Sequence, residues 1–538
     1  MSDEHDAKHA LPDALQQAGG LRKGVPRQVA EEIGVPEAHA HGVGTFFHLL
    51  ARPDAKLRVC TGLSCRMAGA DGVLKAAREA GMPVEGVSCL AGCDVAPAVL
   101  RERRVLPEVR VEDVQAAKGD WKALVSRGGL SEQSWHGHVW PEKPDSEGLA
   151  LDLHGEIDRS AAALRRAEEL GPEAVIGAIE ASGLQGRGGA GFPAHIKWKS
   201  VRAQAEERRY IVLNADEGEP GTFKDREVLM RRPDRVVEGL AIAARVVGAQ
   251  EVWLYLRGEF EVPWRVVEET VAEFRKAGLL DGLEFHLHAG QGAYICGEET
   301  ALLEALEGKR GMPRHKPPFP TEVGLWGKPT LIHNVETIAC VPGIVMRGGA
   351  WFRGLGRAEP GSKLYCVSGH VKRPGTYELP LGVTLDELVE AAGGYVGELF
   401  AFSPGGASSG FLPASERGLP LDFKSLSEAG SMLGSAGVVV LNDSYSLREA
   451  VLDQLRFFEA ESCGQCAPCR IGTHYLRDAF ERRMGTDTDE TDALRNVSEA
   501  AWQMNEGSIC GLGQAAPLPL TSSLKHFPEA FGGKETVS

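Results

Sequence analysis

Eight of the eleven cysteines fall into two groups with spacings suited to a metal centre. The groups are Cys60-x4-Cys65 with Cys89-x3-Cys93, and Cys463-x2-Cys466-x2-Cys469 with Cys510. Thiolates bind soft metals, and closely spaced thiolates let one loop wrap an ion or a cluster while a remote residue completes the shell. The second group has a spacing typical of three ligands of a 4Fe–4S cluster, and the first suits a 2Fe–2S centre held across two loops.

Structural zinc is the alternative for both groups, because zinc also accepts four cysteines. Zinc sites more often use two separated Cys-x2-Cys pairs, so three cysteines in a row favour iron–sulfur. Gly, Pro and small residues surround the second group, which lets backbone N–H groups turn toward sulfur. The three other cysteines stand alone in apolar sequence and are predicted to be buried core residues: Cys296, Cys340 and Cys366.

A glycine-rich segment, SGLQGRGGAGFP (182–193), follows a predicted helix. Dense glycines leave backbone N–H groups bare, so an anionic phosphate can lie against them, and Lys197 adds a positive charge nearby. The glycines are equally consistent with a flexible turn that binds no ligand. The segment is not a standard dinucleotide fingerprint, because no strand leads directly into it.

Three further segments carry polar side chains where a cofactor could bind: 214–227 (NADEGEPGTFKDRE), 289–308 and 316–337. The first follows the strand-like YIVL, and α/β folds place ligands at the carboxyl ends of strands. Carboxylates beside a phosphate loop would repel an anion unless they contact neutral hydroxyls or amides. A redox cofactor with sugar and phosphate fits this pattern, whereas solvated helix caps are the alternative.

Length and composition limit the class of protein. A chain of 538 residues predicts three to five domains, with 43% hydrophobic and 25% charged residues typical of a globular fold. A net charge of −16 argues against nucleic-acid binding as the main role. We expect no export signal and no membrane span, and cysteine usage then favours metal or redox chemistry in a reducing, cytoplasmic setting.

Changes in hydrophobic periodicity divide the chain into six consecutive ranges. We predict an N-terminal helical segment, a compact α/β domain, a linker, a larger α/β domain, a small β-rich domain and a helical bundle, at 1–50, 51–130, 131–154, 155–355, 356–445 and 446–538.

These motifs resemble a known family. GRGGAGFP, NADEGEPGTFKDR, AYICGEETALLEALEG, KPPFP and ESCGQCAPCR are similar to the 51 kDa-type flavoprotein subunit of NADH dehydrogenases, a module also found in NAD-reducing hydrogenases and NAD-dependent formate dehydrogenases. CTGLSC and CLAGCDVAPAV resemble the 24 kDa-type thioredoxin-like 2Fe–2S subunit, here fused in one chain. GMPRHKPPFP, SPGGASSGFLPAS and SICGLGQAAPLPL look closest to the β subunit of cytosolic molybdenum- or tungsten-dependent formate dehydrogenases.

The resemblance implies a multidomain α/β and α+β fold. It implies a thioredoxin-like ferredoxin domain with a 2Fe–2S cluster, a Rossmann-like domain for FMN and NAD(H), a soluble-ligand-binding β-grasp domain and a helical bundle with a 4Fe–4S cluster. The eight grouped cysteines are the implied cluster ligands. The implied flavin-side residues are Gly186, Arg187, Gly188, Gly189, Asn214, Asp216, Glu217, Tyr294, Gly297, Glu298, Glu299, Asn334 and Thr337. The implied nucleotide-side residues are Phe192, Lys197, Phe319 and the candidate catalytic residue Glu219.

Two positions depart from the family pattern. His333 stands where the family often has the first asparagine of a pair. Lys199 follows Lys197 and Trp198, where the family commonly has K-W-S and then an aromatic residue.

The resemblance implies a diaphorase subunit that passes electrons between iron–sulfur clusters, FMN and NAD. Hydride would move directly between stacked rings, so no general acid or base is required, and Glu219 with its acidic neighbours would disfavour a 2′-phosphate. The favoured assignment is the β subunit of an NAD-dependent formate dehydrogenase, whose partner is a catalytic α subunit with molybdopterin and further clusters. The alternatives are the flavoprotein subunit of an NAD-reducing hydrogenase or of complex I, and a non-catalytic zinc-binding assembly subunit.

Overall fold

The computed structural model describes residues 9–126, 139–141, 148–485, 494 and 496–531. Contacts within the chain define two units, each built from three stretches of sequence. Unit 1 comprises Met1–Lys56, Glu142–Glu217 and Lys224–Ser362, and unit 2 comprises Leu57–Pro141, Gly218–Phe223 and Lys363–Ser538. None of the described helices has the length and apolarity needed to cross a membrane.

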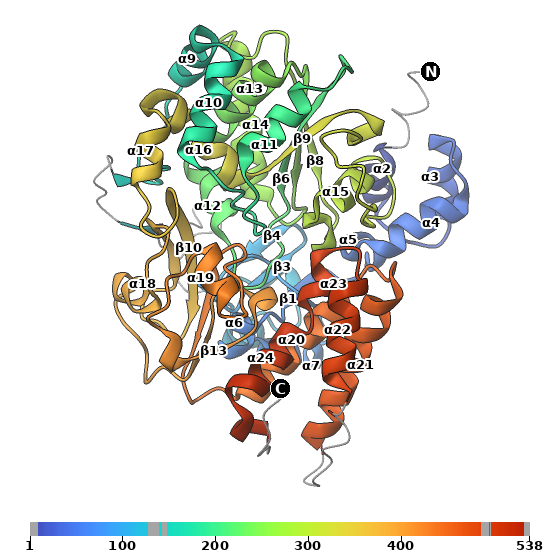
Figure 1. The fold of residues 1–538 in the computed structure, drawn as a ribbon. Coiled ribbons are helices and arrows are strands. Elements are labelled where there is room, and N and C mark those ends of the chain that lie inside the picture. The colour runs from blue at the N-terminus through green and yellow to red at the C-terminus, as the bar shows by residue number, and fades with distance from the viewer. Residues whose placement is uncertain (1–8, 127–138, 142–147, 486–493, 495, 532–538) are drawn as a thin grey trace. The chain divides into compact units, whose positions relative to one another are not determined.

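A four-stranded parallel sheet, of which Figure 1 labels β6, β8 and β9, forms the centre of unit 1. Its strand order is β8–β7–β6–β9. The strands are β6 (Tyr210–Ala215), β7 (Glu251–Leu256), β8 (Glu284–Ala289) and β9 (Thr330–Asn334). Their sequences are almost continuously apolar, as expected for parallel strands that are covered by helices. Because all four strands run in the same direction, their carboxyl ends lie at one edge of the sheet, where α/β folds bind ligands.

Helices of unit 1 pack around this sheet. They are α9 (Ala162–Leu170), α10 (Pro172–Ser182), α11 (Ala194–Arg202), α12 (Lys224–Arg231), α13 (Pro233–Val247), α14 (Glu261–Lys276), α15 (Glu299–Leu306), α16 (Val335–Arg347) and α17 (Gly349–Gly354). Helix α13 packs on α14, α16 and strand β6, and nearly all of its residues are buried. This burial explains why its sequence is too apolar for a surface helix.

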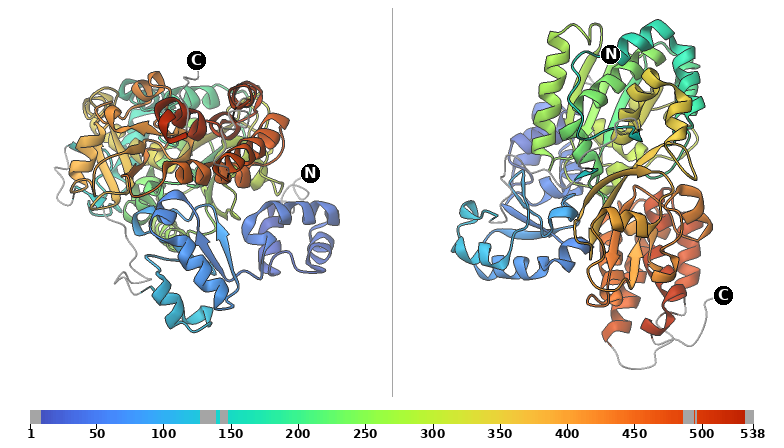
Figure 2. Two further views of the ribbon diagram at one scale, coloured as in Figure 1. Left: turned by 90° about the horizontal axis from the view of Figure 1, so that it is seen from below. Right: turned by 90° about the vertical axis from the view of Figure 1, so that its left-hand side faces the viewer.

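The N-terminal helices also belong to unit 1. They are α2 (Leu11–Gln17), α3 (Val25–Ile33), α4 (Glu37–Phe46) and α5 (His48–Ala51), and Figure 2 shows them as a group of their own. The backbone N–H of His48 donates to Gly292 O at 3.0 Å, and Arg310 Nε donates to Gly42 O at 2.9 Å. The predicted helical segment therefore packs with the parallel-sheet domain, a long-range contact that its periodicity did not reveal.

Unit 2 begins with a small mixed sheet in the order β2–β1–β3–β4. Its strands are β1 (Leu57–Cys60), β2 (Val84–Val87), β3 (Val99–Arg101) and β4 (Arg104–Leu106), with helices α6 (Leu63–Met67), α7 (Ala70–Glu79) and α8 (Val111–Ala116). Strands β1 and β2 are parallel and joined through α6 and α7, whereas β3 and β4 form an antiparallel hairpin. Strands and helices in this region thus form the compact α/β arrangement predicted from the sequence.

A second sheet of unit 2 has the order β13–β12–β14–β10–β11–β5. Its strands are β5 (Val139–Trp140), β10 (Ser362–Gly369), β11 (Gly375–Pro380), β12 (Ala401–Ser403), β13 (Leu412–Pro413) and β14 (Gly437–Leu441), with helices α18 (Leu385–Ala391) and α19 (Phe423–Glu428). Strand β5 lies within the predicted linker, most of whose other residues up to 147 fall outside the described residues, and it pairs with β11.

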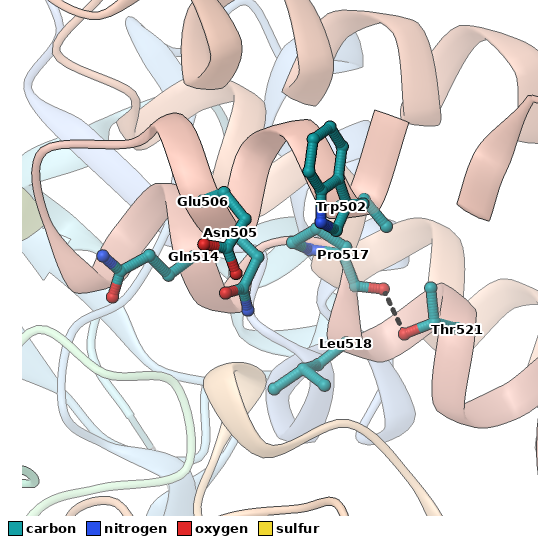
Figure 3. Close-up of a pocket in the computed structure, with 8 residues that line it drawn as sticks. Trp502, Asn505, Glu506, Gln514, Pro517, Leu518 and Thr521 are labelled. Carbon is teal, nitrogen blue, oxygen red and sulfur yellow. Dashed lines mark hydrogen bonds between the residues drawn. The ribbon is translucent and has the colours of Figure 1, made fainter. Parts of the chain in front are cut away.

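Unit 2 ends, in its described residues, with helices α20 (Leu447–Glu461), α21 (Ala467–Gly485), α22 (Val497–Gly507), α23 (Gly511–Ala515) and α24 (Leu518–His526). Helix α21 packs on α20 and α22, and α20 also packs on α24, so they form the helical bundle predicted for this region (Figures 1 and 2). Trp502 and Leu518 line a hollow between α22 and α24, and 65% of the Trp502 side chain is exposed (Figure 3).

Candidate functional site

The glycine loop of unit 1 connects α10 to α11, and no strand leads into it, as predicted. Gly189 has φ +138° and Gly191 has φ +63°, conformations that residues with a Cβ rarely adopt. The N–H of Gly186 donates to Phe192 O at 2.8 Å, which closes the base of the loop. The glycines are therefore required by the backbone path as well as by any ligand.

The loop is fastened to the start of α16. A Cβ on Gly188 would lie 3.0 Å from the Cβ of Asn334, and the N–H of Arg187 donates to Thr337 Oγ1 at 2.8 Å. Arg187 is fully buried and donates from Nη2 to Pro360 O at 2.8 Å, while its Nε and Nη1 have no hydrogen-bond partner among the described residues. A buried guanidinium with unsatisfied donors fits an anionic cofactor bound at this loop.

The carboxyl end of β6 meets a tight turn at Tyr294–Gly297. Asn214 Nδ2 donates to Gly297 O at 2.8 Å, and Asn214 Oδ1 accepts from the N–H of Asp216 at 3.2 Å. A Cβ on Gly297 would lie 3.2 Å from Asp216 O, so glycine suits this close approach. Two segments predicted to bind the same cofactor are thereby brought together at one sheet edge.

Charged side chains gather at the start of α15. The carboxylate of Glu298 caps the helix, accepting from the N–H groups of Thr300 and Ala301 at 2.8 and 2.9 Å. Glu299 pairs with Lys197 at 2.6 Å and with Lys316 at 3.0 Å. Burial acts to raise the pKa of Glu299, but the two ammonium groups outweigh it and lower the pKa to about 2.

This pairing predicts a loss of stability in acid. Because the pKa of Glu299 is lower in the folded chain than in the unfolded one, its contribution is complete above about pH 4.5 and is lost as the pH falls toward 2. We expect Glu299→Gln to lower the free energy of unfolding at pH 6 by on the order of 3 kcal/mol, with the difference from wild type shrinking below pH 4.5.

Urea unfolding at several pH values measures this effect. Glu180→Gln is the matched control, since Glu180 pairs with Lys199 in the same unit but both side chains are 50% exposed. We expect this exposed pair to contribute little at any pH. A difference for Glu299→Gln that stays constant from pH 6 to 3 would contradict the interpretation.

A buried charge network contacts Asn334, one of the candidate flavin-side residues. Glu217 accepts from the N–H groups of Asp225 and Arg226 at 2.8 and 3.1 Å, at the start of α12. Burial and the neighbouring Asp225 carboxylate raise the pKa of Glu217 to about 8. Lys224, fully buried, pairs with Asp225 at 2.7 Å and with Glu336 at 3.1 Å.

The same network orients Asn334. Asp225 Oδ2 accepts from Asn334 Nδ2 at 2.6 Å, and Asn334 Oδ1 accepts from the N–H of Glu336 at 3.0 Å. The amide orientation of Asn334 is therefore determined by partners on both sides. Lys224, Asp225 and Glu336 were not predicted as site residues. The only signal was the charge-rich run KDRE after a strand, and such runs are usually solvated.

His333, which departs from the family pattern, forms a hydrogen bond with Trp198. Trp198 Nε1 donates to His333 Nε2 at 2.7 Å, and both side chains are buried. Burial, with a smaller effect from Lys197, lowers the pKa of His333 to about 3, so the imidazole is neutral. His333 thus anchors α11 to β9 through Trp198.

The residues predicted to face the nucleotide are divided between the units. Phe192 and Phe319 in unit 1 are 46% and 50% exposed, as suits rings available for stacking. Glu219 belongs to unit 2, where its carboxylate accepts from the N–H and the hydroxyl of Ser408 at 2.8 and 3.1 Å. The structure therefore brings Phe192, Lys197 and Phe319 into one unit and assigns Glu219 to the other.

The first cysteine group is buried in unit 2. Cys60 ends β1, Cys65 lies in α6, and Cys89 and Cys93 follow β2, each at most 6% exposed. Contact with Cys60 and burial raise the pKa of the Cys65 thiol well above its ordinary value, and contact with Cys89 and burial do the same for Cys93. Buried thiols in mutual contact require a cationic centre before they can be thiolates, which fits an iron–sulfur cluster.

The second cysteine group also converges in unit 2. Burial raises the pKa of Cys469 to about 12, with further contributions from its neighbours Cys463, Cys466 and Cys510. Ser462 Oγ lies 3.3 Å from Cys469 Sγ. The remaining cysteines are buried as predicted: Cys296, Cys340 and Cys366. Within the described ranges, no three His, Cys, Asp or Glu side chains are placed to hold a single metal ion.

A glycine-loop α/β domain and two four-cysteine groups in one chain define an iron–sulfur flavoprotein. Four family models match: the Nuo51 FMN-binding domain at 179–343, the NADH-ubiquinone oxidoreductase-F iron–sulfur binding region at 449–534, the SLBB domain at 364–411 and the thioredoxin-like [2Fe-2S] ferredoxin at 4–120. The chain belongs to the family of NADH-quinone oxidoreductase flavoprotein subunits of the F type.

Relatives support this membership. The NADH-quinone oxidoreductase F 2 subunit of Rhizobium meliloti (strain 1021) is 47% identical over 382 residues, which cover 69% of this chain and 90% of the relative. The NADH-quinone oxidoreductase F subunit of Mycobacterium bovis (strain ATCC BAA-935 / AF2122/97) is 42% identical over 407 residues, covering 72% and 91%. A chain of the NAD+-reducing [NiFe]-hydrogenase in its H2-reduced state is 31% identical with a TM-score of 0.87, covering 97% of this chain and 92% of that one.

These comparisons confirm the predicted fold class and cofactors. The chain is an oxidoreductase subunit of the NADH-dehydrogenase type, with an FMN-binding domain, a 4Fe–4S region, a 2Fe–2S domain and NAD(H) as the fitting substrate. The β-rich region is an SLBB domain. The individual binding residues and the six domain boundaries stay predictions.

Proposed function

We propose that the chain is the NAD(H)-reactive diaphorase subunit of an NAD-dependent formate dehydrogenase, acting with a molybdopterin-containing catalytic α subunit. The observation that carries the diaphorase role is the occurrence of a glycine-loop cofactor cradle and two four-cysteine groups in one chain. The formate assignment is supported by this fusion and by segments 311–320, 403–415 and 508–520. The cytoplasmic location stays a prediction.

In the proposed flavin site, the chain supplies placement and electrostatics. FMN, when bound, supplies the exchange between two-electron hydride transfer and one-electron transfer. The N–H groups of Gly188 and Gly189 and the guanidinium of Arg187 would hold the phosphate. Asn214 and Asn334 offer amides for the neutral parts of the cofactor. The other proposed flavin-side residues are Gly186, Asp216, Glu217, Tyr294, Gly297, Glu298, Glu299 and Thr337.

The proposed nucleotide-binding residues include two aromatic rings and two charged side chains. Phe192 and Phe319 offer exposed rings for stacking, and Lys197 lies beside Glu299 at 2.6 Å. Glu219 is proposed to disfavour the 2′-phosphate of NADP(H) by charge repulsion, and it transfers no proton. A preference for NADH over NADPH is the measurable consequence.

The eight grouped cysteines are proposed to hold the clusters that exchange single electrons with the partner. Cys60, Cys65, Cys89 and Cys93 would hold the 2Fe–2S cluster, and Cys463, Cys466, Cys469 and Cys510 the 4Fe–4S cluster. Thiolate ligation leaves the potential of each cluster to be tuned by nearby charge and hydrogen bonds.

A direct test is to purify the chain, reconstitute it with iron, sulfide and FMN, and assay dye reduction with NADH and NADPH. We expect flavin and iron–sulfur absorption in the visible region and activity with NADH in preference to NADPH. A folded, colourless chain that holds zinc and binds no FMN would instead support the zinc-binding assembly subunit.

The alternative partner assignment is an NAD-reducing hydrogenase, favoured by the fold similarity over 97% of this chain. The flavoprotein subunit of complex I is the other alternative, because an F subunit of an NADH-quinone oxidoreductase is 47% identical to this chain over 382 residues. Co-purification from the native host followed by metal analysis separates these assignments. Molybdenum or tungsten in the complex supports the formate dehydrogenase, whereas nickel supports the hydrogenase.

A further inference from the structure

An arginine next to a proposed 2Fe–2S ligand connects two parts of unit 2. Arg66 follows Cys65 in α6, and its Nε donates to Thr61 O at 3.0 Å, within the Cys60–Cys65 loop. Its Nη1 donates to Asp453 Oδ1 at 2.7 Å. One guanidinium thus holds the backbone of the cysteine loop and a carboxylate on α20, a helix almost 400 residues further along the chain.

The acceptor of this bridge is itself held in place. Asp453 is 7% exposed, and its Oδ2 accepts from the hydroxyl of Tyr445 at 2.9 Å. The charged and titratable groups that act on Asp453 are Arg66, Tyr445, Asp71 and Arg456, from α6, the segment before α20, α7 and α20 itself. Burial raises the pKa of Asp453 to about 6 despite Arg66, so the carboxylate is charged at neutral pH.

The bridge joins the loop of the first cysteine group to the helix that precedes the second group in the sequence. Helix α20 ends at Glu461, directly before Ser462 and Cys463. A second contact, between Ser64 Oγ and Ser368 Oγ at 2.9 Å, also holds α6, here against β10. Arg66 is anchored one residue after the buried Cys65. A charge close to a buried centre acts in a lower dielectric than water, so it changes the energy of adding an electron more than an exposed charge does.

We propose that Arg66, held by Asp453 and Tyr445, is a positioning residue for the 2Fe–2S cluster: it fixes the Cys60–Cys65 loop against the helix that leads into the 4Fe–4S motif, and its charge sets the midpoint potential of the 2Fe–2S cluster. This inference rests on the proposed function, because it takes Cys60, Cys65, Cys89 and Cys93 as the cluster ligands.

The test is an EPR-monitored redox titration of the reconstituted full chain with Arg66→Gln and Asp453→Asn. Loss of the positive charge makes reduction harder, so Arg66→Gln is expected to lower the midpoint potential of the 2Fe–2S cluster. Loss of the negative charge leaves Arg66 unbalanced, so Asp453→Asn is expected to raise it. We expect the reduced-to-oxidised ratio at a fixed poise to change about tenfold in opposite directions, or ~59 mV for one electron.

Arg78→Gln is the matched control, since it removes an exposed arginine charge from α7 of the same unit that is not among the groups acting on Asp453. We expect it to leave the 2Fe–2S potential unchanged within error. Arg66→Lys keeps the positive charge, so we expect its 2Fe–2S midpoint potential to stay near the wild-type value. This variant provides the test of the charge effect if Arg66→Gln fails to assemble the cluster.

The direction of the two shifts in midpoint potential distinguishes an effect of the Arg66 charge from a purely structural role of the bridge. If the bridge only stabilised the fold, both substitutions would lower the melting temperature and shift the potential in the same direction or not at all, and the inference would be wrong. A wild-type chain with no 2Fe–2S EPR signal would instead overturn the proposed ligand set, so the two failures are distinguishable.

Discussion

Asp225→Asn is expected to lower the free energy of unfolding by about 3–5 kcal/mol and to abolish FMN retention during purification. Lys224 and Asp225 are buried partners 2.7 Å apart, and removing the carboxylate charge leaves the Lys224 ammonium with Glu336 as its remaining carboxylate partner at 3.1 Å. The substitution also disturbs the acceptor for Asn334 Nδ2, whose amide adjoins Gly188 of the glycine loop. Stability and cofactor binding should therefore fall together.

Urea unfolding and the fluorescence of released flavin measure the two effects. Asp54→Asn is the matched control, because Asp54 is exposed in the same unit and its substitution is expected to change stability by less than about 0.5 kcal/mol. Asn334→Ala tests binding apart from the buried pair, and we expect weaker FMN affinity with a smaller loss of stability. An Asp225→Asn chain with wild-type stability and bound FMN would contradict the role of the network.

Cys469→Ser is expected to remove the 4Fe–4S cluster while leaving the 2Fe–2S cluster in place. Cys469 is 4% exposed and lies among the three other cysteines of its group, and a serine hydroxyl is a poor ligand for iron. We expect electron exchange with the partner subunit to fall to background, because the proposed one-electron route passes through this cluster. NADH-dependent dye reduction at the flavin should persist.

Iron analysis and EPR spectroscopy check this prediction. The variant should lose the four irons of one cluster and keep the two of the other. Cys366→Ser is the matched control, since Cys366 is buried in the same unit but stands outside both groups and accepts from the N–H of Phe223 at 3.2 Å. Unchanged iron content and EPR spectra in Cys469→Ser would remove Cys469 from the ligand set.

The fold was predictable where short-range pattern decides it. The apolar run YIVLN became β6, and LREAVLDQLRFFEAESC became α20 up to Glu461, because burial of regularly spaced apolar residues stabilises each element. The placement of α2–α5 with the parallel sheet was not predictable. It depends on contacts such as His48 with Gly292, between residues more than 240 positions apart.

In the candidate site, too, some features could be predicted from the sequence and others could not. Glycines and cysteines signal candidate roles through backbone geometry and thiolate chemistry, so spacing alone was enough to predict the glycine loop and the two cysteine groups as candidate sites. Lys224 and Asp225 were not predicted, because a charge run in sequence does not reveal whether it is buried. The resemblance implied Glu219 as a nucleotide-side residue, but its hydrogen bond with Ser408, 189 positions further along the chain, could not be predicted from the sequence.

By itself, the sequence determined the local chemistry of this protein: glycines that leave backbone donors bare, thiols spaced for soft metals, and the order of helices and strands. Only the tertiary structure decided which distant charges meet, as Lys224 meets Glu336 and Arg66 meets Asp453. The reason is physical, since periodicity encodes which face of an element is buried, whereas the partner of a buried charge depends on how elements far apart in the chain pack together.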